Sequence, residues 1–145
     1  MFGRKDYPQD EVDRGRSAIE RQLAVYDDLA TAVRDAAGAE KAQSALAEFG
    51  TRFFATLVLA LDRPFVHRLR MVTGKDSNPL NEVELIGDSL MNNDGVMRGT
   101  NVIKYVPEQS VVGIAVGEQI RLTAADFTRL STAFFTELER RFVRP

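Results

Sequence analysis

The sequence predicts a helix-dominated α+β fold. Three long stretches place apolar residues three or four positions apart, which is the spacing of one helix face. The segment 101–122 instead carries short runs of β-branched residues, which are typical of strands. Single strands do not alternate with helices, so a doubly wound nucleotide-binding sheet is not expected. The 145 residues suit one domain, 1–145, with a flexible N-terminal segment at 1–9.

An antiparallel helical hairpin is predicted in the first half of the chain. Apolar positions alternate steps of four and three, so the first helix should run from about Asp10 to Ala37. Gly38 follows the last periodic position, where a left-handed turn favours glycine. A second apolar stripe runs over 46–61, and Pro64 should end or kink this helix near Asp62. The short connection predicts that the two helices pack side by side.

The middle of the chain has weaker signals. Residues 65–72 fit either a short helix or a strand, and the preceding Pro64 slightly favours the helix, because proline suits a first helical turn. Residues 73–79 have the composition of a loop. Asn78 before a proline marks the start of another helix, which should end in the turn 92–95.

A small antiparallel β-hairpin or meander is predicted near residues 101–122. Its strands would be 102–106, 111–116 and 119–122. The sequence Thr123-Ala-Ala-Asp126 then resembles a capping box and opens a long C-terminal helix. The apolar face of that helix consists of Phe127, Leu130, Phe134, Leu138 and Phe142.

The composition excludes several classes of site. The chain has no cysteine, so disulfides, thiolate zinc sites and cysteine nucleophiles cannot occur. It has one histidine, His67, so two histidines of one chain cannot share a metal. We therefore expect no metal site and no cofactor. The acidic pI of 5.5 argues against nucleic acid as a partner. We expect a cytoplasmic protein with no membrane contact, because no secretory signal opens the sequence and the longest apolar run, 53–61, is too short to span.

One segment of the chain is markedly basic. Residues 51–75 carry five basic side chains and one acidic one. The candidate anion-binding residues are Arg63, Arg68, Arg70 and Lys75. Guanidinium groups suit phosphate and carboxylate, although pairing with acidic residues inside the fold is the simpler interpretation. His67 and Asp62 are weak candidates for an acid/base pair. The alternative is that His67 is purely structural, so enzyme activity is uncertain and no catalytic residue is assigned.

Adjacent phenylalanines predict a contact surface. Neighbouring residues on a helix point about 100° apart, so one ring of each pair, 53–54 and 134–135, should face outward. The interface candidates are Phe54 and Phe135. Outward rings on two helices would form an apolar patch, which usually marks an interface.

Three functions remain open from the sequence. The leading hypothesis is a small non-enzymatic interaction or regulatory protein that acts as a homodimer or binds another protein. The alternative is a small-ligand or anion-binding protein that uses the basic segment 63–75, either for binding alone or as an enzyme. Nucleic-acid binding is the third hypothesis.

Overall fold

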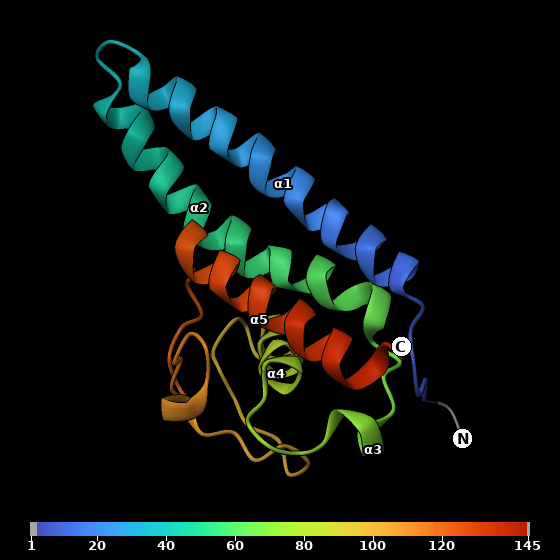
Figure 1. Ribbon diagram of the computed structural model, residues 1–145. Helices are drawn as coiled ribbons and strands as arrows, with labels where there is room; N and C mark the ends of the chain where they lie inside the picture. Colours follow the sequence, from blue (N-terminus) through green and yellow to red (C-terminus); the bar gives the residue numbers. More distant parts are fainter. Residues whose placement is uncertain (1–2, 145) are drawn as a thin grey trace.

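The computed structural model describes residues 3–144, and helices make up most of this range. In chain order the elements, with η for a single 3₁₀ turn, are α1 (Gln9–Asp35), α2 (Glu40–Asp62), η1 (Arg63–Phe65), α3 (Arg70–Thr73), α4 (Pro79–Asn92), η2 (Pro107–Gln109) and α5 (Ala124–Phe142). The antiparallel hairpin α1–α2 and the long C-terminal helix α5 lie where the apolar spacing predicts them (Figure 1). Gly38, in the connection of the hairpin, has a φ of +68° and so uses the left-handed region as expected.

The predicted β-hairpin is wrong, and with it the α+β fold class. The described residues form a helical fold without a strand. Two isolated bridges occur, one between Arg4 and Arg68 and one between Val96 and Gln119. The segment 93–123 instead runs over the body as an irregular chain with the single short turn η2 (Figure 1).

Several backbone N–H groups of this segment donate to side chains, and the main-chain hydrogen bonds between 95–97 and 117–120 give only one isolated bridge, so no sheet forms. Glu82 on α4 accepts the N–H groups of Val111 and Val112 at 2.7 and 3.0 Å. The Ser77 hydroxyl accepts the N–H of Val106 at 3.2 Å. The buried β-branched residues of the segment, Ile103, Ile114 and Ile120, enter the core one at a time. Their composition therefore reflects burial rather than strand pairing.

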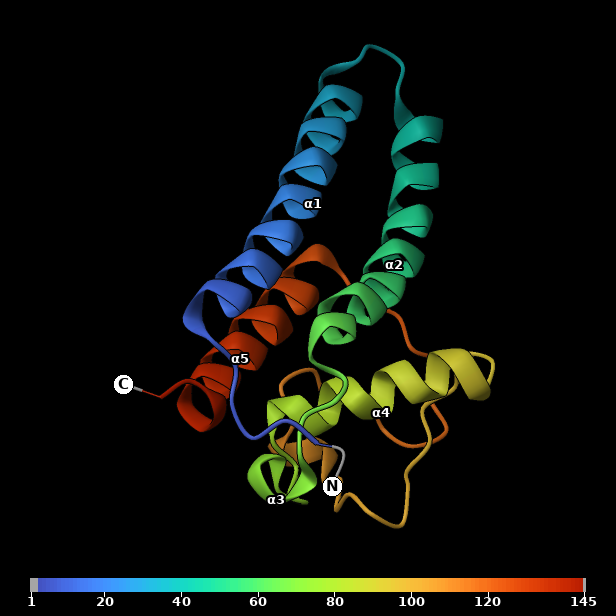
Figure 2. The same ribbon diagram turned by 90° about the vertical axis from the view of Figure 1, so that its right-hand side faces the viewer.

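Helix α4 lies at the centre of the body. It packs against α2 and α5, and the irregular segment 93–123 passes around it (Figure 2). The side chains of Leu80, Val83, Leu85 and Ile86 are fully buried. Asn78 caps the start of α4 as the sequence predicts, because its side chain accepts the N–H of Asn81.

Thr123 and Asp126 form the predicted reciprocal capping box at the start of α5.

The N-terminal end of the described chain is hydrogen-bonded to the body. Residues 3–8, which fall within the predicted flexible segment 1–9, make main-chain contacts with the body. The N–H of Arg4 donates to the carbonyl of His67 at 2.7 Å, and the N–H of Tyr7 donates to the carbonyl of Phe142 at 2.9 Å. Met1 and Phe2 lie outside the described residues.

The stretch 65–72 is helical only at its end. Pro64 lies in η1, which directly follows α2 in the chain, so α2 ends at Asp62 near the predicted position. The short helix α3 begins only at Arg70. The slight preference for a helix over a strand was therefore correct in kind but not in extent.

The distal half of the α1–α2 hairpin projects beyond the rest of the molecule. Helix α5 and the body cover only its lower half, as both views show (Figures 1 and 2). Between residues 20 and 49 no side chain is buried. At the lower end of this stretch the hairpin still faces α5, and Glu48 pairs with Arg121 at 2.7 Å; toward the tip the two helices extend beyond the rest of the molecule.

The helical stretch Glu40–Phe65 is long and apolar enough to cross a membrane by length and composition alone. The core helix of a globular protein meets the same criterion. Its buried residues Phe54, Val58 and Leu61 pack in the hydrophobic core of the described structure. The stretch does not by itself identify a compartment.

Candidate interaction surface

The basic segment does not form an anion pocket. Arg68 is buried, and its side chain is 3% exposed. It donates to the carbonyls of Phe65 and Leu80 at 2.8 and 3.2 Å, and its Nη1 lies 2.8 Å from Asp62 Oδ1. Its donors therefore hold the junction between η1 and the start of α4, where no free anion has access.

Arg70 is also committed to internal partners. Its Nη2 donates to both carboxylate oxygens of Glu84 at 2.8 and 2.7 Å, and its Nη1 donates to Asn81 Oδ1 at 2.6 Å. Arg63 and Lys75 are exposed. The simpler interpretation, in which acidic residues of the fold pair with the basic segment, describes two of the four cations.

Asp62 and His67 are not assembled as an acid/base pair. Burial raises the pKa of the Asp62 carboxyl, while the nearby Arg68 guanidinium lowers it. Asp62 Oδ1 is buried and has no hydrogen-bond donor of suitable geometry, so it is balanced by charge alone. His67 is exposed, and within residues 3–144 its side chain makes neither a hydrogen bond nor an ion pair. The charge partner of Asp62 is therefore Arg68.

Phe54 and Phe135, the interface candidates, are buried. They are 1% and 3% exposed. Phe54 packs edge-on against Tyr26, with ring centroids 4.6 Å apart. Phe135 packs edge-on against Phe65 and Phe134. Because α5 is enclosed on more than one side, both rings of its pair fit inside, and neither candidate presents a surface.

The largest exposed apolar side chains of the hairpin are different residues. Val25 is 66% exposed, Leu29 is 47% exposed, and Phe49 is 51% exposed. The exposed positions that continue their lines are Ala18, Gln22 and Ala32 of α1, Ala36 directly after α1, and Ala42, Ala45, Thr56 and Ala60 of α2. We call these eleven residues the hairpin face.

The two lines lie on the same side of the hairpin. Val25 and Leu29 are about 100° round α1 from the line that faces α2, and Phe49 is about 80° round α2 from the line that faces α1. Both offsets have the same sense, and because the helices are antiparallel, both point to one face. Stacked rings connect the two helices there: Tyr26 lies on Phe53 and Phe53 lies on Phe49, with centroids 5.7 and 5.5 Å apart.

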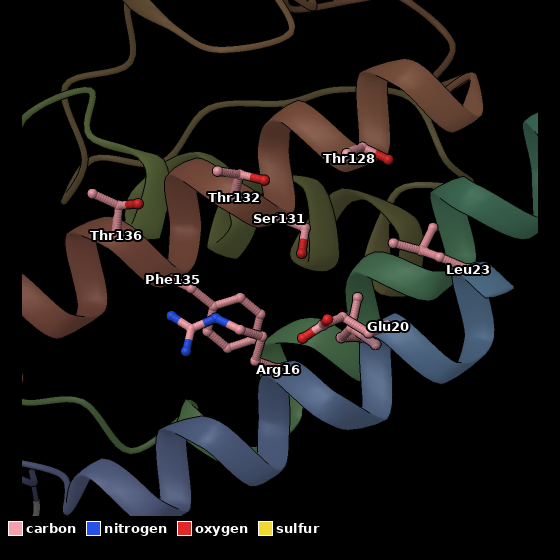
Figure 3. Close-up of a pocket in the computed structure, with 9 residues that line it drawn as sticks. Arg16, Glu20, Leu23, Thr128, Ser131, Thr132, Phe135 and Thr136 are labelled. Atoms are coloured by element: carbon pink, nitrogen blue, oxygen red, sulfur yellow. The ribbon is translucent and has the colours of Figure 1, made fainter.

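Helix α5 covers the opposite side of the hairpin. A groove of about 320 Å³ separates it from α1, where Arg16 and Glu20 of α1 face a row of hydroxyl groups on α5 (Figure 3). These hydroxyls belong to Thr128, Ser131, Thr132 and Thr136. Arg16 is itself paired with Glu139 at 2.7 Å. The groove therefore has no unpaired cation. The hairpin face lies on the side of the hairpin that α5 does not cover.

A signal for the hairpin face was present in the sequence. The positions 18, 22, 25, 29, 32 and 36 repeat the same alternation of four and three as the buried line that starts at Ile19, shifted by one residue. Two adjacent lines of this kind indicate a helix with two packing partners. Reasoning from the sequence assigned one partner, α2, and missed the second line.

No family model matches the chain, and no characterised protein or solved structure is significantly similar to it.

Proposed function

We propose that this chain is a small cytoplasmic interaction protein without catalytic activity, which acts as a homodimer through the hairpin face. The observation that carries the proposal is the exposure of Val25, Leu29 and Phe49 on one side of a projecting hairpin. Large apolar side chains scattered singly need no explanation, but a contiguous group usually marks an interface.

The spacing of the face favours a helical partner. Positions that alternate steps of four and three form the seam of a helical bundle, in which a second helix packs nearly parallel or antiparallel to the first. Six residues of the hairpin face are alanines, which permits a close approach of helix backbones: Ala18, Ala32, Ala36, Ala42, Ala45 and Ala60. A second hairpin on this face would complete a four-helix bundle.

The size of the face also fits a dimer. From residue 18 to residue 36 it extends about 27 Å along the helices, and two packed helices are about 20 Å wide. This corresponds to a flat footprint of about 550 Å² for each copy, and the accessible area of a ridged helix surface is larger. Stable interfaces bury about 800 Å² for each partner.

Light scattering after size-exclusion chromatography tests the proposal. We expect a mass of twice the 16.2 kDa chain at micromolar concentrations and above. The variant Leu29→Glu should run as a single chain, since it places a charge in the apolar centre of the face. Met91→Glu is the matched control, because Met91 is 69% exposed and lies on α4 away from the hairpin.

The control should keep the mass of the unmodified protein, and both variants should keep its helix content by circular dichroism. A single-chain mass for the unmodified protein at hundreds of micromolar would refute the proposal. Loss of the dimer in Met91→Glu as well would assign the interface to another surface.

A further inference from the structure

We propose that the second copy docks antiparallel, with α1 on α1 and α2 on α2, about one twofold axis that passes near position 27 of α1 and position 50 of α2. The inference rests on the homodimer proposed above and specifies its geometry. It follows from three features of the hairpin face: the apolar order along α1, the level of α2 relative to α1, and the charges at the edges.

The first feature is the symmetry of the α1 line about its centre. Val25 and Leu29 are its two large residues, and they lie two positions on either side of residue 27. An antiparallel pairing places Val25 on Leu29 of the second copy and Leu29 on Val25 of the second copy. The same pairing places Gln22 on Ala32, so a larger side chain meets a smaller one in these two layers, and Ala18 meets Ala36. A parallel pairing would stack each residue on itself.

The second feature is the level of α2 beside this centre. The ring of Tyr26 stacks on that of Phe53, and the Tyr26 hydroxyl approaches the backbone of Gly50. Residue 27 of α1 is therefore level with about residue 50 of α2. An axis through both points carries Phe49 onto Phe49 of the second copy. The most exposed ring of the hairpin then lies at the centre of the contact.

The third feature is the charge pattern at the edges of the face. On the outer edge of α1, Arg21 lies six positions before residue 27 and Asp35 lies eight positions after it, so they are on opposite sides of the axis with a difference of about 3 Å along the helix. Neither makes an ion pair within residues 3–144. The antiparallel copy brings Arg21 to Asp35 at both ends of the contact.

The edge of α2 shows the same complementarity. Glu48 and Arg52 lie two positions on either side of residue 50, so each meets the opposite charge of the second copy. Within its own chain Glu48 already pairs with Arg52 at 3.1 Å and with Arg121 at 2.7 Å, so the two copies together form a network of six charges. One contact opposes the arrangement: Asp28 lies almost on the axis and meets its own copy.

The other orientation of two packed hairpins matches only part of these charges: it sets Asp35 level with position 42, beside Lys41, and leaves Arg21 without an opposite charge. A second copy turned about an axis parallel to the helices would set α1 on α2. Arg21 would then lie level with Thr56, which carries no charge. The antiparallel arrangement pairs Arg21, Asp35, Glu48 and Arg52, and we therefore prefer it.

Disulfide cross-linking tests the orientation, because the chain has no cysteine of its own. The two variants are Gln22→Cys and Ala32→Cys, both at exposed positions in the middle of α1. A disulfide requires Cα atoms within about 7 Å of each other. In the antiparallel dimer position 22 of one copy meets position 32 of the other. Two copies of the same position are about 15 Å apart along the helix axis.

We expect an equal mixture of the two variants, refolded together and oxidised mildly, to give a cross-linked dimer. Each variant alone should remain uncross-linked. Efficient cross-linking of either variant with itself, or no cross-link in the mixture although light scattering shows a dimer, would overturn the antiparallel inference and leave the homodimer standing. A single-chain mass for the unmodified protein would overturn both.

Asp28, near the twofold axis, gives a second test, in which a substitution in the interface is expected to strengthen the dimer. Asp28→Asn removes the like-charge contact, so the dissociation constant of the dimer should fall about two- to fivefold at low salt. Asp27→Asn is the matched control, because Asp27 is the exposed neighbour that points away from the face. A weaker dimer in Asp28→Asn than in the control contradicts the placement of the axis.

Discussion

Replacement of Glu82 by alanine removes the acceptor that holds the irregular segment 93–123 against α4. The Glu82 side chain is fully buried on α4. Its two oxygens accept the N–H groups of Val111 and Val112 at 2.7 and 3.0 Å. In Glu82→Ala neither N–H has this acceptor, and a space the size of the lost side chain opens beside them.

The expected loss of stability follows from these contacts. A buried N–H without an acceptor costs about 1–3 kcal/mol, and half-buried groups such as these fall near the lower end because water reaches them. Two such groups cost about 2 kcal/mol together, and the recovered cost of burying a carboxylate reduces the expected loss to about 1–2 kcal/mol in the free energy of unfolding. Glu82→Gln keeps the shape and one acceptor oxygen, so it should lose about 1 kcal/mol.

Burial also gives Glu82 a predictable pH dependence. Burial raises the pKa of its carboxyl, and the two backbone N–H groups only partly offset this. A raised pKa means that the folded state binds the proton more readily than the unfolded state. The contribution of Glu82 to stability therefore declines as pH rises from its unfolded pKa through its folded pKa. Relative to Glu82→Gln, which cannot titrate, the unmodified protein should gain stability as the pH is lowered from neutral toward that unfolded value.

Urea unfolding at several pH values measures both effects, and hydrogen exchange at Val111 and Val112 reports the local one. Both amides should exchange faster in Glu82→Ala than in the unmodified protein. A free energy of unfolding within 0.5 kcal/mol of the unmodified protein, the range of ordinary surface substitutions, would refute the reasoning. So would a relative stability that rises with pH.

Three further predictions concern single contacts. Arg68→Ala should lower the free energy of unfolding by about 3–5 kcal/mol in urea, because it leaves the buried carboxyl of Asp62 without its charge partner; a loss below 1 kcal/mol would contradict this. Gly50→Ala should lower the melting temperature, because its methyl group would meet the Tyr26 hydroxyl, and the double variant with Tyr26→Phe should recover most of the loss; equal losses in both backgrounds would exclude the contact as the cause. Thr123→Ala removes the N-cap of α5 and should cost about 1 kcal/mol in thermal unfolding, whereas Thr128→Ala in the same helix serves as the control; equal effects would mean that the cap is not responsible.

The features that the sequence predicted correctly depend on neighbours along the chain. The helix spacing, the glycine of the hairpin turn and the caps at Asn78 and Thr123 all involve residues within a few positions of each other. Local chemistry determines such features, so one sequence is enough to find them.

The errors involve contacts that the local sequence pattern does not reveal. The segment 101–122 has strand-like residues, but Glu82, 29 positions before Val111, takes the hydrogen bonds that a sheet would need. Asp62 and Arg68 are near in sequence, yet only the turn at η1 brings them together. The hairpin face was missed for a different reason: periodicity shows that α1 has two apolar lines but does not show which line α2 covers.

The attachment of residues 3–8 to the end of α5 makes the chain nearly a closed ring. The N–H of Tyr7 donates to the carbonyl of Phe142, and Arg144 pairs with Asp6 at 3.2 Å, so the first and last described residues lie at one end of the molecule. A short linker between the two ends, with the chain reopened at the exposed Gly38, would reorder the sequence and keep every helix intact. In such a circular permutant α1 and α2 would no longer be joined at the tip. Its dimer affinity would therefore measure how far the covalent turn pre-organises the hairpin face.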